Sequence, residues 1–270
     1  MTQPAGESSP ALPAYTPPRK RYNVRFGLVY AVLGLVVVGA ITGFVLLVAQ
    51  PGHKAPPAWS SWKPVGNDPD VVTQQIAQHV SGEYRFTDQK AIVGIQAGPP
   101  ILTAPAPTAV RLPIVAVERR GQVSVKGSTV IDSTDRAWQY ELCGGGSACS
   151  IEKGKPSITR GALVRREAIE LALYTFKYVP EIDSVIALLP PKPPVTQETP
   201  QYAVYIKRSD LRNELKRPLR MTMPRTPPLK LEAQPLQTTP VDELAGAKVY
   251  KWQPQQLQNG AVLLVLDPIS

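Results

Sequence analysis

Hydrophobic positions are spread unevenly along the chain, and the longest uninterrupted group is the uncharged apolar run 26–49. A helix of this length reaches roughly 36 Å, whereas the hydrocarbon core of a bilayer is about 30 Å thick. A cleaved signal peptide has a shorter apolar region that ends at a small-x-small site, and here Leu47 stands where a small residue is required. The pattern predicts an uncleaved transmembrane helix, a signal-anchor, over 26–49.

A second helical pattern follows the acidic start Asp68-Pro69-Asp70. Val72, Ile76 and Val80 recur at helical spacing behind it. An acidic N-cap followed by Pro at the first helical position is a common start of a helix. We expect this helix to end at Gly82.

The longest helical pattern after residue 50 covers 159–179, and Pro180 ends it. It has an apolar side and a charged stripe. The segment that follows, 182–189, is a continuous apolar run, which indicates a strand covered on both faces.

Alternating, β-branched segments predict several further strands. They are 91–96, 110–118, 122–126, 129–131, 137–142, 201–207, 248–252 and 261–266. Short turns between the earlier members favour an antiparallel meander. Asn259-Gly260 suits either a hairpin turn or the cap of a short helix. The expected fold class is α+β: one N-terminal transmembrane helix, then an extracytoplasmic domain with a meander, one long helix and further strands.

Composition divides the chain into five expected parts. They are a disordered basic cytoplasmic tail (1–25), the transmembrane helix (26–49), a Pro/Trp linker (50–66), an extracytoplasmic α+β domain (67–190) and a Pro-rich C-terminal subdomain or extension (191–270). The linker carries Trp59 and Trp62, which suit either the membrane interface or packing against the folded domain.

Cationic residues before the apolar run set its expected orientation. Four of them flank it directly: Arg19, Lys20, Arg21 and Arg25. The positive-inside tendency then keeps the N-terminus in the cytoplasm and exports everything after Gln50. These juxtamembrane cations also suit anionic lipid headgroups.

Small residues within the run have one spacing of interest. Gly39 and Gly43 are four residues apart, which lets two transmembrane helices approach closely. This leaves a homodimer through the helix open, although Gly is common in such helices.

The net charge of +9 is concentrated in the outer part, where eight cations and only two acids lie between Lys207 and Lys230. We assign a partner- or lipid-binding role to seven of these cations: Lys207, Arg208, Arg212, Lys216, Arg217, Arg220 and Arg225. An outward basic stretch suits lipid headgroups, an anionic envelope polymer or an acidic partner protein, and a solvated basic face is the plain alternative. It lacks interleaved aromatic residues, which argues against binding nucleic acid.

The two cysteines, Cys143 and Cys149, enclose three consecutive glycines. Five intervening residues do not fit a redox dithiol, and the surrounding sequence fits neither a phosphate-binding loop nor a metal site. A lone pair in an oxidising compartment favours a structural disulfide.

No catalytic constellation is evident in the sequence. The two histidines, His53 and His79, are too few and too far apart for a His-based metal site or a Ser-His-acid triad. Carboxylates that could serve a glycan hydrolase are present, but no sequence spacing singles out one pair among them. They include Glu118, Asp132, Asp135, Glu141, Glu167 and Glu170.

We therefore expect a single-pass bacterial envelope protein whose outer domain is a non-enzymatic binding, assembly or accessory module. The chain has no Asn-x-Ser/Thr sequon, which favours a bacterial envelope over a glycosylated cell surface. We assign no catalytic residue, cofactor or metal. Its expected partners are membrane lipids and an envelope protein or anionic polymer. A membrane-tethered hydrolase that uses carboxylates is the alternative, and a transmembrane sensor with a short tail is the second.

Overall fold

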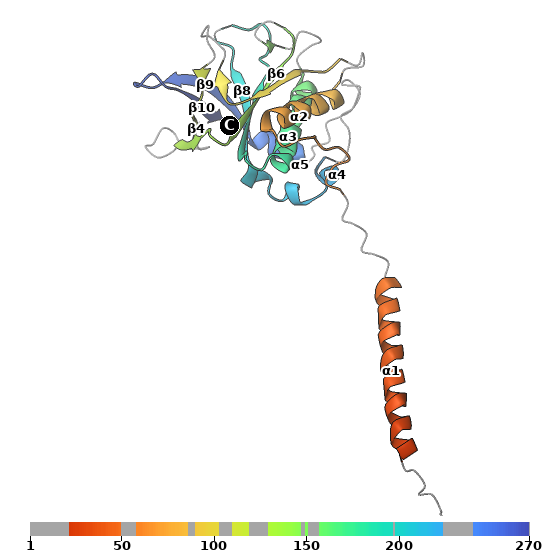
Figure 1. Ribbon diagram of the computed structural model, residues 1–270. Helices are drawn as coiled ribbons and strands as arrows, with labels where there is room; N and C mark the ends of the chain where they lie inside the picture. The colour runs from red at the N-terminus through yellow and green to blue at the C-terminus, as the bar shows by residue number, and fades with distance from the viewer. Residues whose placement is uncertain are drawn as a thin grey trace, which may run out of the picture. The chain divides into compact units, whose positions relative to one another are not determined.

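The computed structural model describes residues 22–49, 58–85, 90–102, 110–118, 129–146, 149–150, 157–196, 198–223 and 240–269. It divides into two units, Met1–Pro57 and Ala58–Ser270. The described element of the first unit is helix α1 (Tyr22–Ala49), drawn in red in Figure 1. Its stretch Phe26–Val45 is long and apolar enough to cross a membrane by length and composition. The predicted apolar helix is therefore present.

The second unit is built on one eight-stranded sheet. Its strands are β1 (Gly94–Gly98), β4 (Ile114–Glu118), β5 (Thr129–Ser133), β6 (Ala137–Cys143), β7 (Ser184–Leu189), β8 (Gln201–Lys207), β9 (Val249–Gln256) and β10 (Val262–Pro268). Their order is β1-β6-β7-β8-β9-β10-β4-β5, with β2 (Ile101–Leu102) and β3 (Val110–Arg111) forming a separate pair. The pairs β6–β7 and β10–β4 are parallel, and the other pairs are antiparallel.

The predicted meander is only partly present. β4 and β5 form an antiparallel pair, but β6 pairs with β1 and β7 instead of β5. The expected strand 110–118 is interrupted at Leu112-Pro113, where Leu112 is fully buried. The expected strand 122–126 lies outside the described residues.

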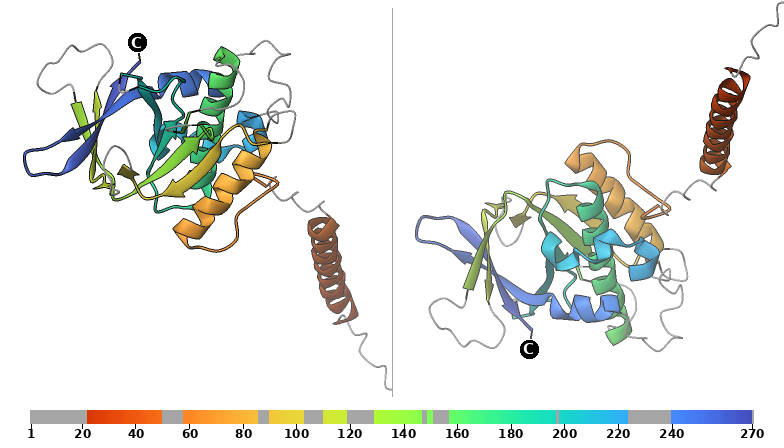
Figure 2. Two further views of the ribbon diagram at one scale, coloured as in Figure 1. Left: turned by 90° about the horizontal axis from the view of Figure 1, so that it is seen from above. Right: turned by 90° about the horizontal axis from the view of Figure 1, so that it is seen from below.

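Strand connectivity forces the sheet to curve. In a flat sheet, β5 and β6 would be about 29 Å apart at the usual interstrand spacing. However, only residues 134–136 join them, and four steps of about 3.8 Å cannot span that distance. The sheet therefore bends back toward itself, as both views in Figure 2 show.

Three helices lie beside the sheet: α2 (Pro69–Glu83), α3 (Ile158–Tyr178) and α5 (Pro240–Ala247). The predicted cap of α2 is present, because the Asp68 carboxylate accepts hydrogen bonds from the backbone N–H groups of Asp70 and Val71. The Ser157 side chain caps α3. Two 3-10 turns, η2 (Arg208–Leu211) and η3 (Glu214–Lys216), precede the short helix α4 (Leu219–Thr222), and α5 is not predicted by the sequence pattern.

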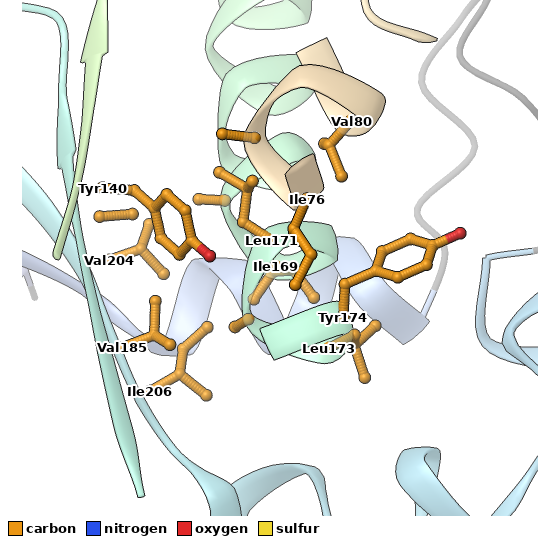
Figure 3. Close-up of a cluster of buried hydrophobic side chains, with 14 of the residues drawn as sticks. Ile76, Val80, Tyr140, Ile169, Leu171, Leu173, Tyr174, Val185, Val204 and Ile206 are labelled. Carbon is orange, nitrogen blue, oxygen red and sulfur yellow. The ribbon is translucent and has the colours of Figure 1, made fainter. Parts of the chain in front are cut away.

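The main core lies between these helices and the sheet (Figure 3). Val185, Val204 and Ile206 point from β7 and β8 toward Ile169 and Leu171 of α3. On the other side of α3, Ile76 and Val80 of α2 complete the packing (Figure 3). Tyr140 reaches into this core from β6, and its hydroxyl shares a 2.6 Å hydrogen bond with the Thr175 hydroxyl.

A second cluster covers the opposite face of the same strands. Ile186 and Leu188 of β7 pack there with Leu264 and Leu266 of β10 and with Leu112. The continuous apolar sequence of β7 correctly predicted burial on both faces.

Residues from the C-terminal third occupy the middle of the sheet. β8, β9 and β10 lie between β7 and β4, so these three late strands belong to the same sheet as the preceding strands. The β9–β10 hairpin is closed at residues 257–261, where Gly260 has φ +82°. This confirms the hairpin interpretation of Asn259-Gly260, because Gly adopts a positive φ without a steric penalty.

Candidate functional site

An open cleft of about 1080 Å³ lies where β7 ends and β8 begins. Its lining comes from five places in the sequence: β2, the end of β6 with Cys149, residues 188–201, residues 251–254 of β9, and Asp267 of β10. Clefts of several hundred Å³ and more are typical of ligand sites. We therefore treat this cleft as the candidate binding site.

One wall of the cleft is the cysteine loop. The sulfur atoms of Cys143 and Cys149 are 2.29 Å apart, at disulfide distance, which agrees with the expected bond. Two backbone hydrogen bonds close the loop further, from Gly144 N to Cys149 O (2.9 Å) and from Gly146 N to Ser150 O (2.8 Å). Cys149 has φ +59°, a region that non-Gly residues seldom adopt, so the surrounding bonds hold it in an unfavourable conformation.

Another part of the lining is the segment 190–200, which the sequence suggested was a boundary between domains. A tight turn orders it: the Thr196 N–H donates to the Thr199 hydroxyl at 2.8 Å, and the Thr199 N–H donates to Thr196 O at 3.1 Å. Pro191, Val195 and Pro200 of this segment line the cleft. A stretch typical of a linker therefore forms part of the candidate site.

The cleft combines apolar surface with an excess of carboxylates. Leu102, Leu188 and Trp252 are among its apolar members. Its charged members are Glu141, Glu198, Asp267 and Lys251. Three carboxylates against one ammonium group make the cleft acidic within a chain whose net charge is +9. Such a lining favours a ligand that has both apolar and cationic groups.

The predicted basic stretch does not form one surface. Lys207 forms an ion pair with Asp132, with 2.7 Å between Nζ and Oδ2. Arg208 lies behind α3, where its guanidinium donates to the carbonyls of Phe176, Val179 and Ile182. Both side chains are therefore used within the fold, and Arg208 in particular satisfies carbonyl groups at the end of α3.

Four further cations of the stretch are exposed in the described part of the chain. Lys216 lies on η3 and Arg220 on α4, while Arg212 and Arg217 follow η2 and η3, and we call these four the cationic face. Arg217 forms a 3.5 Å ion pair with Glu214. The remaining three form no ion pair within the described part of the chain. Arg225 lies outside the described residues.

The two linker tryptophans pack on the folded unit, which decides between the two interpretations of them. Trp59 contacts Tyr174 and Tyr178 edge-on, at centroid distances of 5.3 and 5.8 Å. Trp62 stacks on His79 at 4.0 Å. Burial lowers the pKa of His79, since the charged imidazolium is poorly solvated there.

Two carboxyl groups are buried on α3, away from the residues that line the cleft. Neither oxygen of Glu167 has a hydrogen-bond partner among the described residues, and the Tyr84 hydroxyl donates to Glu170 at 2.8 Å. Burial raises the pKa of both carboxyl groups, and for Glu167 the neighbouring Glu170 raises it further. Both groups have the raised pKa that is typical of an acid catalyst, but they are completely or nearly completely excluded from solvent.

The other predicted residues are dispersed. Asp132 is paired with Lys207 and accepts from the Tyr205 hydroxyl at 2.9 Å, and Glu118 is exposed on β4. Gly39 and Gly43 lie on α1 with no atom near the position of an added Cβ. The juxtamembrane cations Arg19, Lys20 and Arg21 are outside the described residues, as is the side chain of Arg25.

No group of three or more His, Cys, Asp or Glu side chains is placed to hold a metal within the described ranges. Sequence reasoning did not find the cleft, because no local pattern links its five contributing segments. Comparison of the chain with family models, with curated proteins and with solved structures found no match.

Proposed function

We propose that this protein is a single-pass envelope protein, with its N-terminus in the cytoplasm, whose outer domain binds an extended polypeptide segment in the cleft. The apolar helix and the cations that precede it support the anchoring and the orientation. The observation that carries the binding role is the acidic, partly apolar cleft, whose lining includes Cys149 of the cysteine loop and residues of segment 190–200. Its bound segment presents apolar side chains and at least one Lys or Arg.

Binding is favoured over hydrolysis by where the unusual carboxyl groups lie. A glycosidase acid needs a raised pKa and access to the substrate at the same time. Here the carboxyl groups with a raised pKa are Glu167 and Glu170, which are buried on α3 and do not line the cleft. The cleft carboxylates serve as ionic partners for a cationic side chain.

The test is photo-crosslinking in intact cells. A photoreactive amino acid replaces Gln253, which lines the cleft, and in a matched strain it replaces Gln78, which is exposed on α2. We expect a polypeptide adduct at 253 and none at 78. In an E198Q/D267N background we expect the adduct to fall about tenfold or more, since a charge-assisted hydrogen bond contributes ~1.5–3 kcal/mol.

Three outcomes would overturn the proposal: equal adducts at both positions, an adduct insensitive to E198Q/D267N, or release of a cleaved saccharide by the purified protein. Orientation is tested separately, with single cysteines at Ser9 and Ser209 and an impermeant maleimide. Labelling at Ser209 alone is expected, and labelling at Ser9 alone would reverse the topology.

A further inference from the structure

We propose that the cationic face of the outer domain binds the anionic lipid headgroups of the membrane that holds α1. This inference rests on the anchoring part of the proposed function and is independent of the cleft. It concerns Arg212, Lys216 and Arg220, together with the exposed side chain of Met221. It leaves out Lys207 and Arg208, whose charges are used within the fold.

The first supporting observation is that the cationic face adjoins the first residues of the domain. The Leu219 N–H donates to Trp59 O at 2.7 Å, which fixes the start of α4 beside the start of the unit. Lys177 joins the same region: its Nζ lies 5.5 Å from the centre of the Trp59 ring and donates to Leu215 O at 3.4 Å. Trp59 therefore contacts α3 and α4 at the point where the chain enters the domain, and Lys177 links the same place to η3.

The second observation is the length of chain available before that point. Eight residues, 50–57, separate the end of α1 from Ala58. Even fully extended, eight residues span no more than about 30 Å. When α1 is inserted, Trp59 and its neighbours are therefore held near the bilayer surface at a high effective concentration.

The third observation is the composition of this surface. Arg212, Lys216 and Arg220 are exposed, and Met221, which follows Arg220 in the chain, is 62 % exposed. The two nearby acids are already paired, Glu214 with Arg217 and Asp210 with Lys248. Unpaired cations around an exposed apolar side chain fit a surface of phosphate headgroups over acyl chains.

The experiment uses the full chain in lipid nanodiscs. A fluorescent amino acid replaces Met221, or, as a matched reporter, Ile131, which is 69 % exposed on the edge strand β5. Energy transfer to a headgroup acceptor is compared between pure phosphatidylcholine and discs with roughly 30 % phosphatidylglycerol, at low and high salt. We expect the contacting population at Met221 to rise at least about tenfold with the anionic lipid and to return to baseline at high salt, with Ile131 unchanged.

Charge reversals supply the decisive control. R212E/K216E/R220E should abolish the response to anionic lipid, whereas K90E/R111E/K192E, which changes the net charge equally at other exposed positions, should keep it. Equal loss in both triple variants, no response at Met221, or equal responses at Met221 and Ile131 would overturn the proposal. Salt-sensitive capture of soluble polyphosphate without a response to lipid charge would assign the face to a polymer and would also overturn it.

Failure of the anchoring itself is recognised separately. In that case the chain does not co-elute with the nanodiscs, in any lipid composition. A chain that enters the discs but shows no dependence on lipid charge contradicts only the present inference.

Discussion

The cationic face comes from nine consecutive positions, 212–220, whereas the cleft takes its walls from segments between residues 101 and 267. The two surfaces also differ in charge. The face carries four cations, and the cleft has three carboxylates against one ammonium group. One domain therefore presents two surfaces of opposite sign, each suited to a different partner.

This difference shows that charges clustered in the sequence and charges clustered on the folded surface need not be the same residues. The basic stretch is conspicuous in the sequence, yet Lys207 and Arg208 are withdrawn into an ion pair and a helix end. The acidic cleft is invisible in the sequence, because Glu141, Glu198 and Asp267 are far apart along the chain. The cationic face is therefore a continuous stretch of sequence that lacks two of the predicted cations, Lys207 and Arg208. The cleft forms only because the sheet brings distant segments together.

The largest expected effect is on the connection between the cationic face and the domain start. Trp59→Ala removes an indole that packs on Tyr174 and Tyr178, so we expect a loss of about 3 kcal/mol in the free energy of unfolding, or a Tm lower by about 6–12 °C. The lipid response of the Met221 reporter should fall, while the adduct at 253 persists. Trp59→Phe should recover most of both Tm and lipid response. An unchanged Tm in Trp59→Ala would show that the aromatic contacts do not hold this surface.

Removing the disulfide should instead weaken the adduct at 253 and leave the lipid response at Met221 intact. In the chain-entropy model a ring of this size contributes about 2–2.5 kcal/mol, so C143S/C149S should lower the Tm by about 4–10 °C. Because Cys149 lines the cleft, the adduct at 253 should weaken, whereas the lipid response at Met221 should not change. A reductant should reproduce the shift in the wild type and have no effect on the double variant. If the adduct survives intact, the cysteine loop is not a functional wall of the cleft.

The smallest expected effect is on the pH dependence of stability, and it distinguishes the buried carboxyl groups from those in the cleft. Burial raises the pKa of Glu167, so the folded protein holds this proton more tightly than the unfolded chain. Its contribution to stability is therefore complete below the usual pKa of about 4.5 and is lost as the pH rises toward the folded value. Glu167→Gln cannot ionise, so near pH 8 it should be more stable than the wild type by on the order of 1 kcal/mol, about 2–4 °C in Tm.

Thermal unfolding between about pH 4 and pH 8 measures this effect. The advantage of Glu167→Gln should vanish at the acidic end, and Glu118→Gln, at an exposed position on β4, should follow the wild type throughout. The adduct at 253 should be unaffected. A stability gain that is constant with pH, or a lost adduct, would contradict the assignment of Glu167 to the core alone.

Local signals in the sequence predicted individual elements well. Asp68-Pro69 marks the start of α2, the 159–179 pattern matches α3 within one residue at each end, and 201–207 is β8. These succeed because caps, Pro positions and periodicity act within a few residues of one another. The break at Leu112-Pro113 was missed, because Leu112 turns inward to fill the second core cluster.

The order of the strands in the sheet could not be predicted from such local signals. β5 and β6 are consecutive, which favours a hairpin, yet among the described strands β5 pairs with β4 alone, and β6 lies between β1 and β7. Their separation depends on β10, which enters the sheet parallel to β4 from more than a hundred residues away. Segment 190–200 illustrates the same limit, since its composition suits a linker and its position makes it a wall of the cleft.

By itself, then, the sequence determined the apolar helix, the two longest helices and most strands of the second unit, and the pairing of its two cysteines. Each of these depends on composition or on spacing along a short stretch of chain. Tertiary structure alone decided the curvature of the sheet, the withdrawal of Lys207 and Arg208, and the gathering of Glu141, Glu198 and Asp267 in one cleft. These features depend on contacts between distant residues, and such contacts exist only after the strands have paired and the core has packed.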